Sequence, residues 1–362
     1  MPHPRPAAFT RRLHLLAHLL VLLPLLLLGA CATALSPDEA ALVAGKTYVV
    51  TGASSGFGRG VALKLGAMRA NVVLAARRTA VLDEVAAQVA AAGGTPLVVT
   101  TDVARPDDVR RLAEATVARF GRIDVWINNA GVGAIGHFDT VPMEDHARIV
   151  DVNLKGVIYG SHVALRQFRK QGQGTLVNIG SVESAVPLAY HASYASTKAA
   201  VLSLGRALRE ELRLSNQPGI RITTVLPWAA DTPFFNHAAN YTGRAPRMAL
   251  MDDPGKVVDI IVRASVYPRE EVPAGWKARG GYWSHRIAPD AAERISANVA
   301  HAEQFEKAGP APDGSNAVHQ PMPAGPGTTG VDGGIRARME REDAARKTGQ
   351  APGPWSPTPP AS

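Results

Sequence analysis

Short apolar runs alternate with amphipathic stretches from about residue 44 to residue 265. The apolar runs are rich in Val, Ile and Leu, as is typical of strands that are buried on both faces. They lie at residues 47–50, 71–75, 96–100, 123–127, 175–179 and 221–226. The stretches between them repeat apolar residues at helical spacing, chiefly at residues 61–68, 81–92, 106–120, 143–155 and 254–265. Strands that alternate with helices of this length predict an α/β fold, a doubly wound parallel sheet covered on both faces.

Two regions beyond the N-terminus depart from this alternation. Residues 228–251 combine aromatic and small residues with turn signals, so we expect a flexible loop that covers the site. Residues 306–362 are rich in Pro, Gly, Ala and Ser and show no apolar period. This composition predicts a disordered tail, with at most a short charged helix near residues 336–347. We therefore expect a single catalytic domain over residues 36–305.

Residues 1–35 have the pattern of a targeting segment. Two arginines precede an apolar run at residues 13–28, and small residues follow, which is the order of a secretory signal. The sequence Leu28-Gly29-Ala30-Cys31 resembles the lipobox of bacterial lipoproteins, in which the cysteine is acylated. An uncleaved hydrophobic anchor is the alternative, and either would attach the protein to a membrane, on a side that the sequence leaves open. Palmitate should label the wild-type chain and not a Cys31→Ser variant if the lipoprotein hypothesis holds.

Composition mainly excludes classes of function. The chain is 46% hydrophobic and 19% charged, as expected for a globular protein with an ordinary core. The formal net charge is +8, but Lys and Arg form no run of the kind that marks a nucleic-acid-binding face. We therefore expect no nucleic-acid partner, whereas an anionic cofactor suits a modestly basic protein. No cluster of His, Cys and Asp in the sequence suggests a metal site.

A glycine-rich turn joins the first predicted strand to the first predicted helix. Its sequence is Thr51-Gly52-Ala53-Ser54-Ser55-Gly56-Phe57-Gly58. Glycines at such a turn let the backbone approach a pyrophosphate, and the N-terminus of the helix favours the negative charge. The turn therefore predicts a dinucleotide site, although a tight strand-to-helix connection would also use glycine.

Tyr194 and Lys198 are spaced so that, on a helix, they lie one turn apart on the same face. The pKa of a free tyrosine is about 10, and a nearby ammonium group lowers that pKa by favouring the phenolate. Such a pair could exchange a proton near neutral pH, as carbonyl or alcohol chemistry requires. Taken alone, the spacing also fits an ordinary amphipathic helix.

Together these motifs resemble the short-chain dehydrogenase/reductase family over about residues 44–265. The resemblance rests on the T-G-x-x-x-G-x-G turn and, in the family's order, on Asn128-Asn129-Ala130-Gly131, Asn153, Ser181 and the Tyr194/Lys198 pair. It implies a Rossmann-type fold. It also implies an oxidoreductase that transfers a hydride between a nicotinamide and a carbonyl or alcohol carbon.

The resemblance implies a role for each matching residue. Tyr194 would be the general acid/base, and Lys198 would lower its pKa and bind the nicotinamide ribose. Ser181 would hold the substrate oxygen, and Asn153 would position a water in a proton relay, unless it is only a polar residue that bends its helix. The residues that would contact the cofactor include Gly52, Ser54, Ser55, Gly56, Phe57, Gly58, Asn129, Ala130 and Gly131, together with Tyr194 and Lys198.

The end of the second predicted strand bears on the choice of cofactor. Ala76 stands where NAD sites usually place an acid, and Arg77 and Arg78 suit a 2′-phosphate. We therefore expect NADP(H), with NAD(H) as the alternative, although two arginines could also be a solvated start of a helix. After the third strand, Asp102 and Val103 resemble the family's adenine contact, and Asp102 could instead cap a helix.

The segment after the sixth predicted strand departs from the family pattern. Pro227 is followed by Trp228 in place of the usual glycine, while Thr232 stands where a carboxamide contact is expected. Trp228, Phe234 and Phe235 could line an apolar substrate pocket or simply pack the covering loop. We expect a small carbonyl or alcohol substrate that is partly apolar.

Two further points stay open in the sequence. His191 and Glu183 lie near Tyr194 and could touch substrate, but surface positions are the more natural interpretation. The second hypothesis for function is a membrane-attached, nucleotide-binding scaffold or sensor without catalysis. The intact set of Asn153, Ser181, Tyr194 and Lys198 argues against it, and a homo-oligomer remains open.

Overall fold

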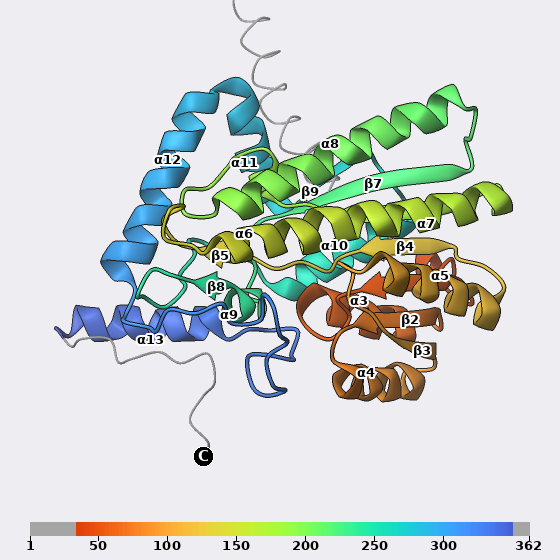
Figure 1. Ribbon diagram of the computed structural model, residues 1–362, viewed down its shortest axis with the longest axis horizontal. Helices are drawn as coiled ribbons and strands as arrows, with labels where there is room; N and C mark the ends of the chain where they lie inside the picture. Colours follow the sequence, from red (N-terminus) through yellow and green to blue (C-terminus); the bar gives the residue numbers. More distant parts are fainter. Residues whose placement is uncertain (1–33, 350–362) are drawn as a thin grey trace, which may run out of the picture.

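The computed structural model describes residues 34–349, and a seven-stranded parallel sheet forms the centre of this part of the chain (Figure 1). The strands follow the order β3-β2-β1-β4-β6-β7-β9. Their bounds are β1 Thr47–Thr51, β2 Asn71–Ala76, β3 Thr95–Thr100, β4 Val125–Asn128, β6 Gly174–Ile179, β7 Ile220–Pro227 and β9 Glu271–Ala274. The expected doubly wound sheet is therefore confirmed. Its order reverses between β1 and β4, and ligands of such sheets bind beyond the carboxyl ends of the strands at this point.

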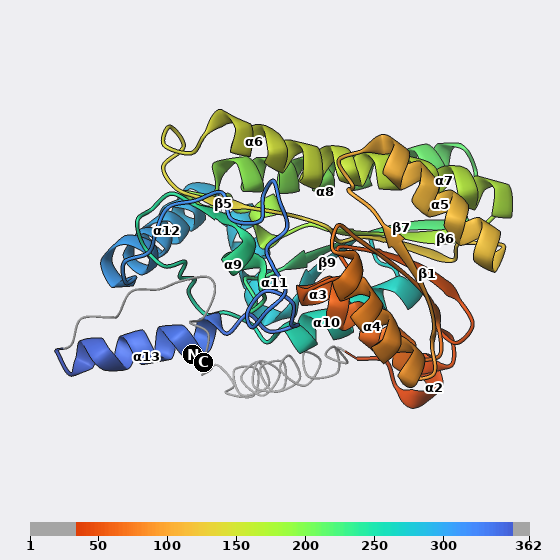
Figure 2. The ribbon, with the colours of Figure 1, turned by 60° about the horizontal axis from the view of Figure 1, so that its bottom comes forward.

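Helices cover both faces of the sheet (Figure 2). One face packs against α3 (Gly56–Ala67), α4 (Thr79–Ala91) and α10 (Pro254–Val266). The other face packs against α5 (Pro106–Phe120), α7 (Gly156–Gln171) and α8 (Ala192–Leu214). The other helical segments of the described chain are α2 Pro37–Ala40, α6 Met143–Val150, η1 Asp151–Lys155, η2 Val182–Ser184, α9 Phe234–His237, α11 Gly275–Ile287, α12 Pro289–His301, η3 Ala302–Lys307 and α13 Ile335–Lys347.

Two large apolar clusters, one on each face of the sheet, make up most of the core of the described residues, and two smaller clusters form around Phe235 and Tyr282. Successive residues of a strand point to opposite faces, so Val50 and Leu74 enter the cluster under α3, whereas Val49 and Val73 enter the cluster under α7. Burial on both faces explains why the strands read as short, nearly continuous apolar runs.

Some elements lie where the apolar pattern gives no signal. Strand β9 holds one large apolar residue, Val272, and a proline, Pro273. Proline is tolerated there because β9 is an edge strand that pairs with β7 alone. The expected covering loop at residues 228–251 contains α9 and a short strand, β8 (Ala239–Asn240), which pairs with β5 (Ala134–Ile135).

The expectation of a disordered tail is wrong for the part of the tail that the structure describes. Residues 306–349 pack against the domain, bury Val318 in the core and end in α13, which matches the expected short charged helix. The almost fully buried Arg247 holds α13 through ion pairs with Glu342 at 2.7 Å and Asp343 at 2.8 Å. The pattern missed this packing because it depends on single buried side chains and backbone hydrogen bonds, not on an apolar period.

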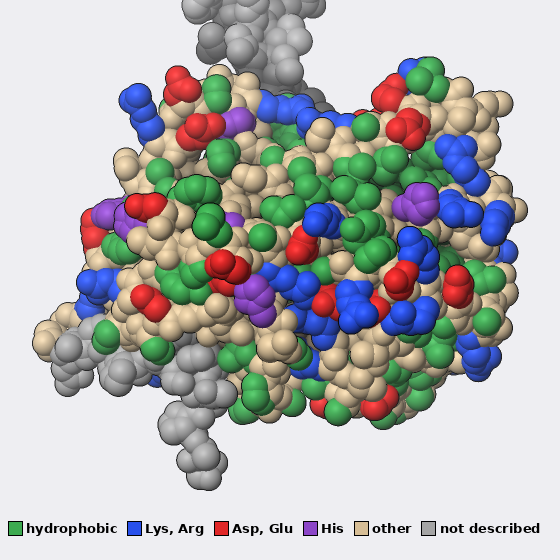
Figure 3. Space-filling view, in the orientation of Figure 1, with side chains coloured by type: hydrophobic (Ala, Val, Ile, Leu, Met, Phe, Trp, Pro, Cys, Tyr) green, Lys and Arg blue, Asp and Glu red, His purple; other side chains and the backbone are tan. Residues whose placement is uncertain are grey.

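The lipobox-like sequence and Cys31 lie outside the described residues. Between residues 34 and 349, no helix is both long and apolar enough to cross a membrane. Figure 3 shows one face of the molecule, where Lys and Arg side chains are interspersed with Asp and Glu and form no single basic stripe.

Candidate active site

The glycine-rich turn lies at the carboxyl end of β1, where the strand order of the sheet reverses. Gly52 has a φ of +70°, and a Cβ at this position would lie 2.9 Å from Ala130 Cα. A Cβ at Gly58, in the first turn of α3, would lie only 2.3 Å from the carbonyl oxygen of Gly52. Glycine is therefore required at both positions for α3 to begin directly against the turn, with its N-terminus toward the cavity.

Thr51 and Asn129 tie the ends of β1 and β4 together. The Thr51 hydroxyl oxygen accepts hydrogen bonds from the amides of Asn129 at 2.9 Å and Ala130 at 3.1 Å. In return, Asn129 Nδ2 donates to the Thr51 carbonyl at 2.8 Å. These bonds hold the two strand ends at a fixed separation, and the cavity opens between them.

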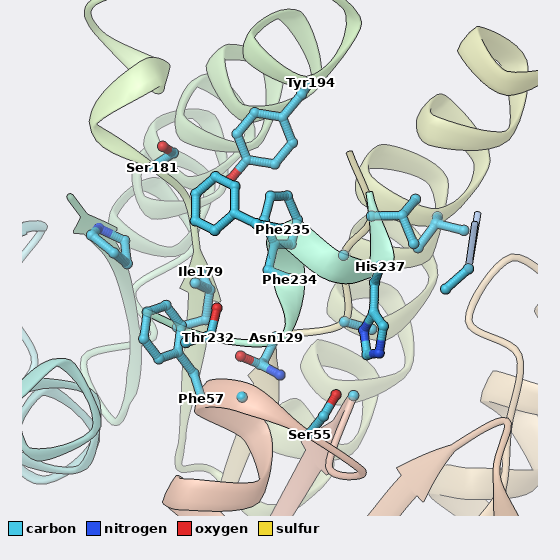
Figure 4. Close-up of a pocket in the computed structure, with 18 of the residues that line it drawn as sticks. Ser55, Phe57, Asn129, Ile179, Ser181, Tyr194, Thr232, Phe234, Phe235 and His237 are labelled. Atoms are coloured by element: carbon cyan, nitrogen blue, oxygen red, sulfur yellow. The ribbon is translucent and has the colours of Figure 1, made fainter. Parts of the chain in front are cut away.

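Tyr194, Lys198 and Ser181 meet at the other end of this cavity. Figure 4 shows the Tyr194 hydroxyl directed into the cavity on the side of Ser181. The Tyr194 ring packs against Phe234, with 5.3 Å between ring centroids. Lys198 Nζ donates to the Ile179 carbonyl at 2.7 Å and lies 5.6 Å from the centroid of the Tyr194 ring. Ser181 is held at the end of β6 by its hydroxyl, which accepts from the Glu183 amide at 3.1 Å.

The pKa of Tyr194 shifts opposite to the direction expected from its spacing to Lys198. Burial raises this pKa, the negative charge of Glu183 raises it further, and a hydrogen bond with Ser181 opposes both. Burial also lowers the pKa of Lys198 to about 8, against the opposing effect of Glu183. The expectation failed because a sequence spacing contains no information on burial or on a third, negatively charged group. A tyrosine in this environment stays protonated near neutral pH.

Asn153 is fully buried in η1, a π-helical turn, and supports the site through hydrogen bonds to the neighbouring backbone and to α8. Its Oδ1 accepts from the Val132 amide at 2.8 Å, and its Nδ2 donates to the Val132 carbonyl at 2.8 Å and to Thr197 Oγ1 at 3.2 Å. The side chain therefore connects the loop after β4 with α8. The expected water relay through Asn153 stays a prediction.

Positive charge gathers at the end of β2, where the cavity passes Ala76, Arg77 and Arg78. The carboxylate of Asp102 also lines this region, but it is paired with Arg148 at 2.7 Å and accepts from the Ala104 amide. Burial lowers the pKa of Arg77, against the opposing charge of Asp102, and burial together with neighbouring arginines lowers the pKa of Arg78. With two arginines beside one carboxylate that is itself paired with Arg148, this region of the cavity keeps a net positive charge.

One cavity brings together nearly all of the predicted site residues. Gly58 and Asn153 do not line this cavity, because they contact the residues that form its wall: Gly58 packs against Gly52, and Asn153 bonds Val132. The predicted residues that do line it are Gly52, Ser54, Ser55, Gly56, Phe57, Arg77, Arg78, Asp102, Val103, Asn129, Ala130, Gly131, Ser181, Tyr194, Lys198, Pro227 and Thr232. Trp228, Phe234 and Phe235 line it as well, so the aromatic residues of the covering loop face the site.

Several further residues lie at the site although the sequence predicts a surface position for them or gives no signal. Glu183 and His191 are buried and line the cavity, in contrast to the surface positions expected for them. His237 lines the cavity beside the arginines; burial lowers its pKa to about 4, and the charge of Arg78 acts in the same direction. Residues of the C-terminal segment, Ala317, Pro321 and Met322, complete the wall, and no motif in that segment could have indicated this.

The fold and the site define an oxidoreductase that binds a nicotinamide dinucleotide and acts on alcohol or carbonyl groups. A family described as short chain dehydrogenase matches residues 46–241, and the chain belongs to this family. The resemblance noted in the sequence is therefore confirmed.

Similar proteins agree with this assignment. An uncharacterized oxidoreductase of Bacillus subtilis, YxnA, is 32% identical over 266 residues, which cover 72% of this chain and 74% of that protein. An alcohol dehydrogenase of Thermococcus sibiricus, solved with 5-hydroxy-NADP, is 27% identical to this chain with a TM-score of 0.54. The match covers 63% of this chain and 94% of the dehydrogenase chain. A 3-ketoacyl-(acyl-carrier-protein) reductase of Brucella melitensis, solved with NADH, is 26% identical with a TM-score of 0.55. This match covers 64% of this chain and 96% of the reductase chain.

Proposed function

We propose that the protein is an NADP(H)-dependent oxidoreductase that interconverts a carbonyl and an alcohol, with Tyr194 as its general acid/base. The observation that carries the proposal is that a single cavity holds Tyr194 and Ser181 at one end and Arg77 and Arg78 at the other. The two solved relatives contain different dinucleotides. The preference for NADP(H) therefore rests on the arginines and on Ala76, which leaves no carboxylate at the end of β2 to bind a ribose 2′-hydroxyl.

The residues of the cavity fit a phosphorylated dinucleotide. Gly52, Gly56 and Phe57 line the cavity where α3 begins, which is the position at which a helix N-terminus binds a pyrophosphate. His237 Nε2, beside the two arginines, has no hydrogen-bond partner among the described residues, and in the tautomer protonated at Nε2 it would donate a hydrogen bond to a phosphate oxygen. Ser54, Ser55 and Phe57 would face the pyrophosphate, and Thr232 and Lys198 would face the nicotinamide end.

Three side chains would act on the substrate oxygen. Bound NADPH supplies the hydride, so that carbonyl, hydride and one proton give an alcohol. Ser181 would donate a hydrogen bond to the carbonyl oxygen, and Tyr194 would transfer its phenolic proton to the same oxygen as negative charge develops there. The ammonium of Lys198 would compensate the charge that remains on the phenolate. A protonated Tyr194 is the form that donates to a carbonyl oxygen, as reduction requires.

The pH dependence of reduction should reflect Lys198. The ammonium form lies on the acid side of a pKa of about 8, so its charge is lost as the pH rises through this value. We expect kcat/KM for carbonyl reduction to fall above about pH 8, and a Lys198→Arg variant, which keeps its charge, to lack this decline in its residual activity. A wild-type profile that stays flat to about pH 10 would contradict the role of the Lys198 charge.

A carbonyl panel followed by NADPH absorbance tests the proposed function. Apolar and aromatic ketones and aldehydes should be reduced, because Trp228, Phe234 and Phe235 line the cavity. NADPH should be preferred over NADH at equal concentrations. Reduction with NADH alone would refute the cofactor preference, and no turnover of any carbonyl with bound NADPH would refute the proposed activity.

A further inference from the structure

The segment between Ala317 and Gly330, called here the C-terminal strap, crosses the cavity at the end assigned to the adenosine. Figure 1 shows this blue segment between α9 and α3, before α13. The strap lies beyond the part of the chain that matches the family, which ends at residue 241. Ala317, Pro321 and Met322 line the same cavity as Gly52 and the glycine-rich turn, so the strap forms part of the cavity wall.

Backbone carbonyls of the strap accept hydrogen bonds from the cofactor-binding residues themselves. Arg77 donates to the carbonyls of Ala317 and His319, both at 2.8 Å. Arg78 Nη1 donates to the carbonyl of Thr328 at 3.0 Å. The amide of Gly56, which begins α3, donates to the carbonyl of Gly330 at 2.9 Å.

We propose that the strap is the outer wall of the binding site for the adenosine 2′-phosphate end of NADP(H). This inference rests on the proposed function. A guanidinium has five N–H donors, so Arg77 and Arg78 keep donors for a phosphate while the strap fixes their orientation. Fixed arginines bind a phosphate without a further loss of side-chain freedom, and a dinucleotide beneath the strap leaves only when the strap opens. The strap therefore slows the release of the cofactor.

Two glycines of this region provide a matched pair of variants. A Cβ at Gly333, just past the strap, would lie 2.3 Å from the carbonyl oxygen of Thr232, whereas a Cβ at Gly325 would meet only Thr328 Oγ1 at 4.0 Å. Gly333→Ala should therefore push the strap away from the domain, and Gly325→Ala should not. Because Thr232 belongs to the site, Thr328→Val serves as a second loosening variant: it removes the hydroxyl that donates to the carbonyls of Pro323 and Gly325.

The experiment measures the dissociation rate of NADPH by stopped-flow fluorescence, with excess NADP⁺ as the competitor. We expect Gly333→Ala and Thr328→Val to release NADPH about tenfold faster or more, and Gly325→Ala to match the wild type within about twofold. Hydrogen exchange of residues 317–330 in the wild type should slow when NADPH is added. Unchanged rates in both loosening variants, or slower release from them, would overturn the inference. This experiment measures NADPH dissociation and needs no carbonyl substrate. Failure of the proposed reaction would therefore appear in a separate assay, as an enzyme that binds NADPH but reduces no carbonyl.

A second inference comes from Glu183, which lies at the substrate end of the cavity. Its Oε1 is 3.2 Å from His191 Nδ1, and its Oε2 has no hydrogen-bond partner among the described residues. Both residues are buried beside Tyr194 and Ser181. Buried polar atoms in native proteins nearly always have a partner, so an unpartnered carboxylate oxygen on a residue that lines a cavity indicates a partner supplied by a ligand.

We infer that Glu183 Oε2 accepts a hydrogen bond from a hydroxyl of the substrate, so that the preferred substrates are hydroxylated carbonyl compounds. This inference also rests on the proposed function and narrows its substrate class. The surrounding aromatic residues would hold the apolar part of the same molecule. A site that binds a hydroxyl in this way strongly rejects an analogue that lacks it, because the carboxylate oxygen is then left unpaired.

Matched ketones test this inference through a ratio of kcat/KM values. The pairs are phenacyl alcohol with acetophenone, and β-hydroxypropiophenone with propiophenone. At least one hydroxyketone should be preferred by about a hundredfold in the wild type, and Glu183→Gln should reduce that preference by about tenfold or more. The control Glu210→Gln, on the exposed face of α8, should keep it. Equal kcat/KM values for the two members of each pair would overturn the inference, and so would an equal loss of kcat/KM on both members in Glu183→Gln. Failure of the proposed function would instead appear as no reduction of any ketone.

Discussion

Replacement of Tyr194 by phenylalanine should lower kcat for carbonyl reduction by about a thousandfold, because the variant lacks the proton donor. NADPH should still bind, within about threefold of the wild-type Kd, since the phenyl ring can keep the packing against Phe234 and the cavity changes by one oxygen atom. Steady-state kinetics and fluorescence titration of NADPH measure the two quantities.

Tyr190→Phe is the matched control for this prediction. Its hydroxyl bonds His301 Nδ1 at 2.8 Å, outside the cavity, so loss of that hydroxyl should leave kcat within about threefold of the wild type. If Tyr194→Phe kept full activity, the assigned role of Tyr194 would be refuted. If both variants lost activity equally, a general loss of structure would account for the effect.

The second large effect should come from the arginines at the end of β2. In the double variant Arg77→Ala/Arg78→Ala we expect the Kd of NADPH to rise by about a hundredfold or more, because charge-assisted hydrogen bonds to the 2′-phosphate contribute roughly 1.5–3 kcal/mol each. The Kd of NADH should rise by less than about tenfold, since NADH lacks this phosphate and loses only the contacts of the loosened strap. Titration with both cofactors gives the ratio.

The control removes two arginines from an exposed surface. Arg110 and Arg119 are exposed on α5. Their double alanine variant removes two positive charges, as Arg77→Ala/Arg78→Ala does, and therefore has the same net charge. This control variant should bind NADPH and NADH with Kd values within about threefold of the wild type, because salt screens exposed charges that lie far from the cavity. An equal loss of NADPH and NADH affinity in Arg77→Ala/Arg78→Ala would contradict the assignment of these residues to the 2′-phosphate.

The parts of the molecule that depend on local pattern were predictable from the sequence. The apolar runs of β1 and β2 and the proline at the start of α5 are local signals that do not depend on distant contacts. The glycine turn, Ser181 and the Tyr194/Lys198 pair were predictable for the same reason. Each occupies a strand end or a helix face, and the parallel sheet brings those ends to one edge.

The remaining features depend on contacts between distant residues. The strap reaches the site through backbone carbonyls, as at Ala317 and Thr328, and carbonyls have no sequence signature. The direction of the Tyr194 pKa shift required knowledge of its burial and of the nearby Glu183. Glu183 itself read as a surface residue because a charged side chain is rarely buried unless it serves a ligand or a partner.

The central claim is that this site transfers a hydride from NADPH to a carbonyl carbon while Tyr194 protonates the oxygen. The most direct test uses NADPH deuterated at the reactive C4 position and a ketone that the enzyme reduces, with mass spectrometry of the alcohol. We predict one deuterium on the carbinol carbon with the wild type and almost none with Tyr194→Phe. An alcohol without deuterium when both C4 positions of NADPH are labelled, or undiminished deuterium transfer in Tyr194→Phe, would contradict it.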